Sequence, residues 1–438
     1  MDKNEIISIL NDWNFWQKPV KHGIYRENYV SKLNDLLKSK QIITITGPRR
    51  AGKSYLMRQL GQTLIDKEVN KNNLLYVNFE DPRFTNLDTD LMQQIFETYL
   101  QRLLPEGKIY LFLYEVQEVE NWEKWVLMVH ELEKAQVIIS GSNARLLSRE
   151  LGTLLTGRHL DITVTPLSFK EFLLFKDIEI SSNLEIIDQK INLLSLLESY
   201  LETGSFPEVV LIDGKRELLL TYYEDILTKD LLKRFNVRKP QAMKKLIKFY
   251  FSNISSLITY SSSAKLADIT TDTAEKFSGY LESVFMISFL QKFSYKVKEQ
   301  EKSPRKVYSI DTGLSNVAGF KFSRNSGKLV ENVVFLELKR RQIFDSDLEL
   351  YYWKDRYHRE VDFLIKSGDK ISKLIQVCWN ISDPRTKQRE LKALYTAMEE
   401  FNMKEGIIIT NDAEFTEKDQ GREIKCIPLY KWLLNAPY

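Results

Sequence analysis

The 438-residue sequence has few of the residues that build disulfide frameworks or metal clusters. It contains two cysteines, Cys378 and Cys426, and four histidines. The cysteines lie far apart in the chain, without the short spacing of a zinc site, and the histidines form no cluster. The sequence therefore predicts neither a disulfide-stapled domain nor a structural zinc site.

Long apolar runs and targeting patterns are lacking as well. No stretch approaches the ~20 apolar residues that span a bilayer, and the first residues show no secretory pattern. The sequence has no internal repeat and no tract rich in proline, glycine or serine. We therefore expect a cytoplasmic protein that has no membrane partner.

An excess of charge of one sign is also missing. The chain has 63 Lys and Arg against 60 Asp and Glu, a net charge of +3. This balance excludes a polycationic coat for nucleic acid, so any basic function has to be local.

Hydrophobic residues make up 43% and aromatic residues 12%, which is enough for packed cores. A chain of this length is too long for one core and predicts two to four domains.

A glycine-rich motif follows an apolar run near the N-terminus. The β-branched run 41–46 has the composition of a buried parallel strand, and residues 55–64 have a helical pattern. Between them, residues 47–54 read Gly-Pro-Arg-Arg-Ala-Gly-Lys-Ser. Strand, glycine-rich turn and helix in this order are the context of a phosphate-binding loop, whose N–H groups surround phosphates at a helix N-terminus. The motif predicts a site for ATP and Mg²⁺.

The residue types of this loop have distinct chemical roles. Lys53 is expected to reach the β- and γ-phosphates, and the Ser54 hydroxyl is expected to bind Mg²⁺. The glycines let the backbone approach the phosphates. The predicted nucleotide-binding residues here are Gly47, Pro48, Arg49, Arg50, Ala51, Gly52, Lys53, Ser54 and Tyr55.

A second apolar strand, residues 108–115, ends in an acid. Glu115 is placed to orient and activate the attacking water. The position that normally holds an aspartate for Mg²⁺ carries Tyr114. A phenol is neutral at pH 7 and does not replace a carboxylate around a metal ion, so we expect slow ATP hydrolysis.

Two further acids offer a substitute for the missing aspartate. Glu80 and Asp81 follow a β-like run over residues 73–79. If that strand neighbours the strand of Glu115, one of these carboxylates faces the same Mg²⁺. The alternative is that they cap a turn at Pro82.

A third apolar run, residues 135–140, is followed by small polar residues. Asn143 is predicted to contact the γ-phosphate or water, and the alternative is that it caps a helix near Ala144. Arg158 precedes a further strand, residues 160–164. It is a candidate arginine finger towards the γ-phosphate of a neighbouring subunit, which would require a homo-oligomer; the alternative is a surface arginine.

The middle of the chain is helical and then basic. Helical periodicity from Pro166 to Leu232 predicts an α-helical lid. The segment 229–248 carries a cluster of basic residues, which predicts contacts to DNA phosphates or a solvated helix face. Its basic residues are Lys229, Lys233, Arg234, Arg238, Lys239, Lys244, Lys245 and Lys248.

Residues 244–310 have the order of a winged helix-turn-helix. We expect a helix, a serine-rich break, two helices, a strand over 289–298, a charged loop over 299–305 and a strand over 306–310. The second of the two helices after the break is the expected recognition helix, and it offers few groups for reading bases. Winged helices also bind proteins, so the pattern is compatible with DNA or with a protein as the partner.

The last segment predicts the order α-β-β-β-α-β over residues 326–410, which is the order of PD-(D/E)XK nucleases. Glu331 and Asp362 are placed as metal ligands. The third strand, however, offers Gln376 and Cys378, an amide and a thiol, where such enzymes have a carboxylate and a lysine. We therefore expect a degenerate site without nuclease activity, unless Lys387 or Arg389 on the next helix supplies the missing cation.

Together these motifs resemble one group of proteins: the prokaryotic AAA+/STAND-like ATPases with a restriction-endonuclease-like C-terminal domain. The similarity covers nearly the whole chain, and Tyr114 and the Gln376 and Cys378 pair depart from the family pattern. The matching segments are 47–54, 78–84, 113–122, 140–143, 157–158, 203–208, 307–313, 331–332 and 360–363.

The resemblance implies an α/β fold with a P-loop AAA+ parallel sheet, a helical lid, a winged helix and an α/β restriction-endonuclease-like domain. The predicted boundaries are 1–164, 165–238, 239–318 and 319–438. The resemblance also implies that Gly204 and Pro207 lie in the lid near the adenine. The predicted function is a nucleotide-dependent switch or motor that binds ATP and Mg²⁺ and acts on DNA. The alternatives are a non-catalytic nucleotide-binding scaffold and an ATP-gated, Mg²⁺-dependent nuclease.

Overall fold

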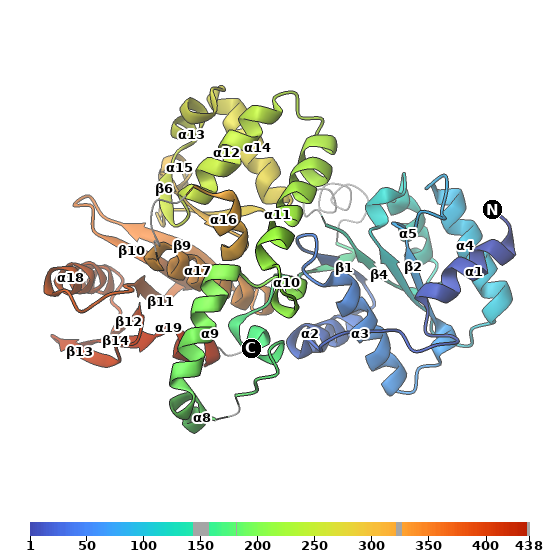
Figure 1. Ribbon diagram of the computed structural model, residues 1–438, viewed down its shortest axis with the longest axis horizontal. Helices are drawn as coiled ribbons and strands as arrows, with labels where there is room; N and C mark the ends of the chain where they lie inside the picture. Colours follow the sequence, from blue (N-terminus) through green and yellow to red (C-terminus); the bar gives the residue numbers. More distant parts are fainter. Residues whose placement is uncertain (143–156, 181, 321–325, 436–438) are drawn as a thin grey trace. The chain divides into compact units, whose positions relative to one another are not determined.

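The computed structural model describes residues 1–142, 157–180, 182–320 and 326–435. The chain divides into two compact units, Met1–Thr165 and Pro166–Tyr438, which are described separately below (Figure 1). Among the described residues, no helix combines the length and the apolar character needed to cross a membrane.

The first unit is built on a parallel sheet whose strand order is β2-β3-β4-β1-β5. Strand β1 therefore lies between β4 and β5, and the loop that follows it opens at the carboxyl ends of all three strands. This edge is where open parallel sheets bind their ligands. The strands are β1 (Ile42–Thr46), β2 (Leu74–Asn78), β3 (Tyr110–Tyr114), β4 (Gln136–Ser140) and β5 (His159–Thr163).

Helices of the first unit bury apolar side chains against this sheet. One continuous core contains side chains of α1, α4 and α5 together with β2, β3 and β4, and its centre includes Trp16, Phe96, Tyr99 and Trp125. The α-helices are α1 (Lys3–Trp13), α2 (Glu27–Leu36), α3 (Lys53–Asp66), α4 (Thr89–Leu103) and α5 (Trp122–Glu131). Short 3-10 turns span Leu37–Ser39, Lys71–Asn73 and Val116–Glu118. The parallel sheet and its helices agree with the predicted P-loop AAA+ fold of this unit.

The second unit begins with helices, as the sequence predicts after Pro166. They are α7 (Phe169–Leu174), α8 (Asn183–Asp188), α9 (Lys190–Thr203), α10 (Pro207–Leu211) and α11 (Lys215–Asp225), followed by a π-helical segment, Ile226–Lys233. Next comes a small antiparallel sheet of order β6-β8-β7. Its elements are α12 (Pro240–Ser252), β6 (Ser256–Ile258), α13 (Tyr260–Ala267), α14 (Thr271–Ser283), β7 (Ile287–Leu290), α15 (Val297–Lys302) and β8 (Arg305–Ser309).

Two sequence expectations for this small sheet are wrong. The strand expected over 289–298 ends at Leu290, and most of the expected charged loop 299–305 is helix α15. The helix forms because its sequence after the first residue, Lys-Glu-Gln-Glu-Lys, consists of strong helix formers. Ion pairs from Lys292 to Glu299 and from Arg305 to Glu301 support it. Strand β6 in the serine-rich break was also not predicted.

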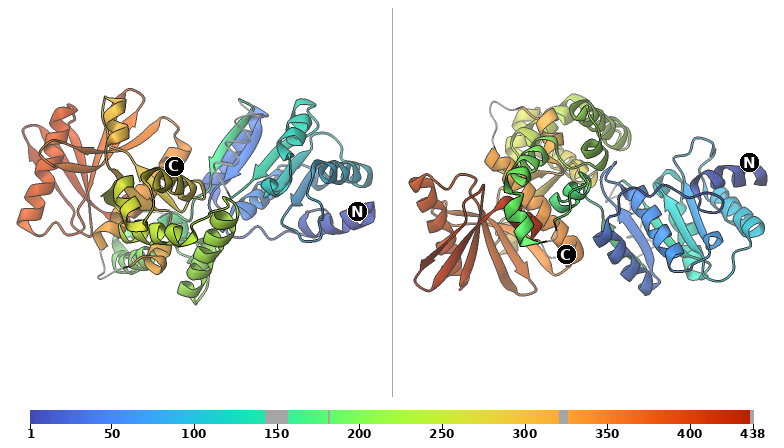
Figure 2. Two further views of the ribbon diagram at one scale, coloured as in Figure 1. Left: turned by 90° about the horizontal axis from the view of Figure 1, so that it is seen from above. Right: turned by 60° about the horizontal axis from the view of Figure 1, so that its bottom comes forward.

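The C-terminal part carries a mixed six-stranded sheet of order β13-β14-β12-β11-β10-β9 (Figure 2). Helix α18 packs on it through Leu394, Ala397 and Met398. The expected order α-β-β-β-α-β is present, and two strands and a helix follow it. The elements are α16 (Thr312–Ala318), α17 (Ser326–Phe344), β9 (Leu348–Lys354), β10 (Glu360–Ser367), β11 (Lys370–Val377), α18 (Pro384–Glu400), β12 (Glu405–Thr410), β13 (Phe415–Asp419), β14 (Arg422–Pro428) and α19 (Leu429–Leu434).

A buried carboxylate joins two of the sequence motifs in the second unit. Asp311 caps α16 by accepting from the Leu314 N–H at 2.9 Å, and it accepts from the N–H and the hydroxyl of Ser205 at 2.6 and 3.1 Å. Burial raises the pKa of Asp311. Gly204 adjoins the same carboxylate so closely that a Cβ atom there would overlap it. The segments 203–208 and 307–313 therefore form one packed joint.

We expect Gly204→Ala to lower the thermal stability of the protein more than Gly214→Ala does. Gly204 has φ 77° and ψ −162°, a region that is almost restricted to glycine, and its new methyl group would displace Asp311. Gly214 also has positive φ, 71°, but a Cβ there meets only ordinary van der Waals contact. Backbone strain costs roughly 1–2 kcal/mol in Gly214→Ala, in the left-handed α region, and about 1–3 kcal/mol in Gly204→Ala. The overlap should add about 1–3 kcal/mol for Gly204.

Calorimetric unfolding of both variants tests this expectation. Equal shifts of the unfolding midpoint would contradict the tight packing of Gly204 against Asp311.

Candidate nucleotide-binding site

The loop between β1 and α3 has the backbone shape of a phosphate cradle. Gly47, Arg50 and Gly52 have φ values of 139°, 66° and 94°. A side chain at Gly47 would overlap the carbonyl oxygen of Val164, so only glycine allows this close approach. Helix α3 begins directly after the loop, which turns the N-terminus of the helix towards the cradle.

The lysine of the loop lies inside it. Lys53 is 3% exposed, and its Nζ donates to the carbonyl oxygens of Gly47 and Pro48 at 3.0 Å each. The same Nζ is 3.9 Å from a carboxylate oxygen of Glu115. The fold thus brings together two predicted catalytic residues from α3 and from the end of β3.

Glu115 and its neighbour differ in charge. Glu115 is buried, has a left-handed backbone with φ 50°, and accepts a hydrogen bond from the Gln117 side-chain amide. Burial raises the pKa of Tyr114 well above its usual value, and the carboxylates of Glu115 and Glu80 add to this effect. The phenol therefore stays neutral, and β3 supplies one carboxylate to the site.

The two substitute acids have different surroundings. Both carboxylate oxygens of Asp81 are bonded by the Arg83 guanidinium, and one also accepts from the Trp13 indole at 2.8 Å. The hydrogen bond from Arg83 lowers the pKa of Asp81. These contacts support a turn-capping role for Asp81. Glu80 instead pairs with Arg49 of the phosphate loop at 3.0 Å and so lies beside the cradle.

Two serine hydroxyls at and just after the end of β4 are buried. Ser140 and Ser142 are 0% and 2% exposed, and among the described residues neither hydroxyl has a hydrogen-bond partner. Ser140 is in register with Ile45 of β1, two residues before the cradle. An unsatisfied buried hydroxyl costs about 1–3 kcal/mol, so a pair of them beside a phosphate loop points to a ligand. Asn143, the residue chosen from the sequence, lies outside the described residues.

Arg158 lies at the other end of the sheet. It precedes β5, its carbonyl accepts from the Ile42 N–H at the start of β1, and its side chain forms an exposed ion pair with Glu131. The length of a five-residue strand, roughly 17 Å, separates it from the loop. This placement supports a surface role within the chain itself, and a role towards a neighbouring subunit stays a prediction.

The last two predicted nucleotide contacts are Tyr55 in the first unit and Pro207 in the second. Tyr55 is about half exposed on the first turn of α3, and Gly23 packs against its ring. Pro207 begins α10 in the second unit, next to Phe206 and Val209, which pack with Tyr222. A contact between Pro207 and adenine stays a prediction.

The second predicted metal site, in the second unit, holds a lysine. The ammonium of Lys306 on β8 is 3.0, 2.8 and 2.7 Å from carboxylate oxygens of Glu331, Glu360 and Asp362. Burial acts to lower the pKa of Lys306, but Asp362 and Glu331 outweigh it, and the pKa lies well above its usual value. A divalent cation at this point would meet a fixed positive charge, so the residues present do not fit a metal ion.

The other groups of this cluster are engaged as well. Gln376 accepts from the Asp362 N–H and donates to Glu390, and Asp362 accepts from the Val377 N–H. Burial raises the pKa of the Cys378 thiol to about 12, so this side chain is an inert neutral group.

The cation that completes this cluster was not the one expected. Lys387 pairs with Glu417, and Arg389 pairs with Glu390, whereas Lys306 comes from β8. One signal in the sequence could have found it. Lys306 and Tyr308 are two residues apart in the predicted strand, and therefore point to the same face of it. Tyr308 donates to Glu331 at 2.8 Å.

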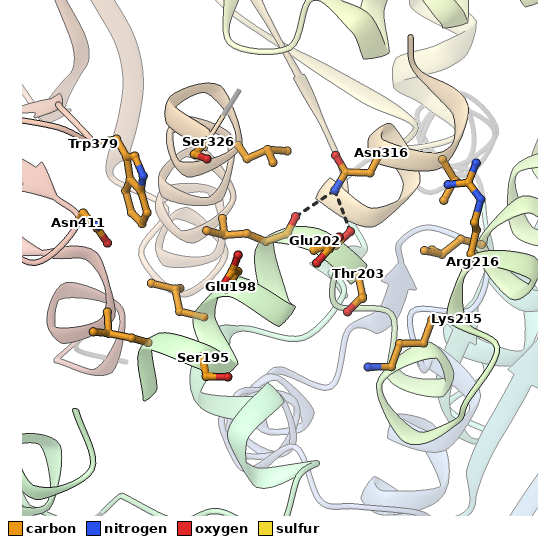
Figure 3. A pocket seen from close by; sticks show the side chains of 16 residues that line it. Ser195, Glu198, Glu202, Thr203, Lys215, Arg216, Asn316, Ser326, Trp379 and Asn411 are labelled. Atoms are coloured by element: carbon orange, nitrogen blue, oxygen red, sulfur yellow. Dashed lines mark hydrogen bonds between the residues drawn. The ribbon is translucent and has the colours of Figure 1, made fainter. Parts of the chain in front are cut away.

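A cavity of about 970 Å³ lies between α9, α11, α16 and α17 of the second unit. Figure 3 shows Lys215 and Arg216 on one side of it and Trp379 and Asn411 on the other. The side chain of Asn316 donates to the carbonyls of Leu201 and Glu202, so it ties α16 to the end of α9. The cavity is thus a feature of the joint between these helices.

Three protein-family models match successive parts of the chain: an AAA domain over residues 39–173, and two domains of unknown function, DUF8612 over 194–324 and DUF4143 over 326–432. An uncharacterised protein of Methanocaldococcus jannaschii is 34% identical over 409 residues, which are 90% of this chain and 88% of that protein. An uncharacterised protein of Haemophilus influenzae is 31% identical over 424 residues, 95% of this chain and 100% of that protein. This chain belongs to their family.

The family match covers the phosphate loop and the strands around it. The first unit is therefore a P-loop AAA+ ATPase-type nucleotide-binding domain. Among solved structures, one match is the Walker-type ATPase PABY2304 of Pyrococcus abyssi, with a TM-score of 0.45 and 14% identity over 70% of this chain and 99% of that chain.

We expect the purified AAA-family protein not to cut DNA with Mg²⁺ or Mn²⁺ at neutral pH. The Lys306 ammonium already holds the position between Glu331 and Asp362 that a divalent cation would need. Cys378 cannot stabilise the charge that develops on a phosphate. Incubation of a supercoiled plasmid with each metal, followed by gel electrophoresis, measures nicking. Metal-dependent nicking that disappears in Asp362→Ala would contradict this expectation.

Proposed function

We propose that this protein is an ATP-dependent switch or motor, in which Mg²⁺ and ATP bind at the phosphate loop and ATP is hydrolysed slowly. The observation that carries the proposal is the buried Lys53 and Glu115 pair beside the unsatisfied hydroxyls of Ser140 and Ser142. Lysine, carboxylate and buried serine hydroxyls around a glycine cradle match the needs of a triphosphate and its attacking water.

The roles of the residues follow from their chemistry. Lys53 would exchange the loop carbonyls for phosphate oxygens, and Glu115 would orient and activate the water. Ser54 would hold Mg²⁺, with Glu80 as the nearest further carboxylate candidate. The ion, once bound, would neutralise charge on the phosphates. Because Tyr114 is a neutral phenol in place of the usual carboxylate, turnover should be slow.

We expect Lys53→Ala and Glu115→Gln to separate binding from hydrolysis. Loss of the ammonium should weaken ATP binding at least about tenfold, the effect of a lost charge-assisted hydrogen bond. Glu115→Gln should keep ATP binding and lower turnover by about 10²-fold or more, because the amide cannot accept a proton. Calorimetric titration and phosphate release measure the two effects, and the exposed Glu131→Gln is the control. Unchanged ATP affinity in Lys53→Ala would contradict the site.

We further propose that the second unit associates with DNA through its basic surface. The exposed cations of the predicted basic segment are Lys229, Lys233, Arg238, Lys239, Lys244, Lys245 and Lys248. Of the acids nearby, Asp230 is buried and Asp225 pairs with Lys229. The element order from α12 to β8 and the sheet order β6-β8-β7 support the winged-helix interpretation.

Charge reversal tests this DNA association. Lys244→Glu, Lys245→Glu and Lys248→Glu together should weaken binding to all sequences alike and flatten the log–log salt dependence by roughly 0.9 for each lost phosphate contact. A control variant reverses three exposed lysines of the C-terminal part, Lys370, Lys373 and Lys404. Fluorescence anisotropy over a range of salt concentrations measures both variants. An unchanged affinity would favour the alternative, a scaffold that recruits protein partners.

A further inference from the structure

One buried arginine joins the phosphate loop to the chain segment that leaves the first unit. Arg26 is 3% exposed. Its Nη1 donates to the carbonyl oxygen of Ala51 in the loop, and its Nη2 donates to the carbonyl oxygen of Thr165, both at 3.1 Å. Because a guanidinium is planar and rigid, both carbonyls are held in register by one group.

The position of Arg26 is itself fixed from two helices. Its N–H donates to the side chain of Gln59 on α3, whose amide in turn donates to the carbonyls of His22 and Ile24. Its guanidinium lies over the ring of Tyr29 on α2, 4.5 Å from the ring centre. These contacts keep the guanidinium aimed at both carbonyls, so a shift of the Ala51 carbonyl alters the geometry of the planar group that also bonds the Thr165 carbonyl.

The segment beyond β5 touches the loop at further points. Val164 donates to the Thr46 carbonyl at 2.8 Å, and its own carbonyl lies against Gly47. The Tyr29 hydroxyl accepts from the Thr165 N–H at 3.2 Å and pairs with the Thr165 hydroxyl at 3.1 Å. Residues 164–165 are thus attached to both the beginning and the middle of the phosphate loop.

Pro166 and Leu167, the next residues of the chain, are held by hydrogen bonds within the second unit. The Arg340 guanidinium donates to the carbonyls of Pro166 and Leu167 at 3.4 and 3.0 Å. Leu167 donates its N–H to the Ser205 carbonyl at 2.8 Å and accepts from the Tyr200 hydroxyl. Thr165 and Pro166 are consecutive, so a carbonyl held in the first unit and one held in the second are neighbours in the chain.

We propose that Arg26 is a positioning residue that couples nucleotide binding in the loop to the chain at Thr165 and Pro166. The inference rests on the proposed function. To reach a phosphate, Lys53 has to leave the carbonyls of Gly47 and Pro48, and Ala51 is hydrogen-bonded to that same Pro48 carbonyl. The loop rearranges, and Arg26 carries the movement of the Ala51 carbonyl to Thr165.

Hydrogen exchange of the Leu167 amide tests the coupling in the full-length protein. We expect saturating Mg²⁺ and ATP to change its exchange rate in the parent protein. In Arg26→Lys this change should be lost, because separate nitrogens of one rigid guanidinium bond the two carbonyls, whereas lysine offers a single nitrogen on a flexible stem. ATP affinity should fall by no more than about tenfold, the effect of one hydrogen bond. The matched control is Arg58→Lys on α3, whose side chain bonds the Lys21 carbonyl; it should respond to ATP like the parent.

Each result has a distinct meaning. An ATP response in Arg26→Lys equal to that of the parent would overturn the coupling, and so would a parent that binds ATP without any change at Leu167. Loss of ATP binding in a stably folded Arg26→Lys would make Arg26 part of the binding site itself and also overturn the proposal. A parent that binds no ATP would refute the proposed function first. If Arg26→Lys does not fold, Tyr29→Phe, which removes one link to Thr165, should reduce the response.

Discussion

The first unit depends on one close backbone approach, that of Gly47 to the carbonyl of Val164. This contact sets the beginning of the phosphate loop against the end of β5, and no side chain fits between them. The loop can then turn through Arg50 and Gly52, both in left-handed conformations, into α3. Lys53 is thereby directed into the cradle, next to Glu115 from β3. The chemistry of the site and its connection to the rest of the chain thus begin at the same glycine.

Buried ionic and polar contacts organise the second unit. Asp311 binds Ser205 and caps α16, and Lys306 joins β8 to α17 and β10 through three carboxylates. Arg340 joins α17 to Pro166 and Leu167. Removing one partner of such a contact leaves a buried charge behind, which costs far more than a surface pair is worth. These contacts therefore specify how the helices and the two sheets of the unit pack together.

Much of this architecture could be predicted because its signals are local. The run 41–46, the loop and the helix after it lie in sequence order, and α17 to β12 also follow the expected order closely. The parts that could not be predicted depend on long-range neighbours. The partner of Asp362 is Lys306, 56 residues earlier, and the partner of Ala51 and Thr165 is Arg26. Helix α15 was missed for another reason, since the winged-helix pattern favoured a loop where local propensity favours a helix.

The polar groups of the two predicted ligand sites differ in how far they are already paired within the protein. At the phosphate loop, Ser140 and Ser142 keep buried hydroxyls without partners among the described residues, and the loop lysine is bonded to carbonyls that any incoming phosphate can replace. In the second unit, the carboxylates of Glu331, Glu360 and Asp362 are already paired with Lys306. Leaving polar groups unsatisfied costs stability unless a ligand satisfies them, whereas an internally paired cluster gains nothing from one. This asymmetry supports ligand-dependent chemistry at the loop and a structural role for the lysine-filled cluster.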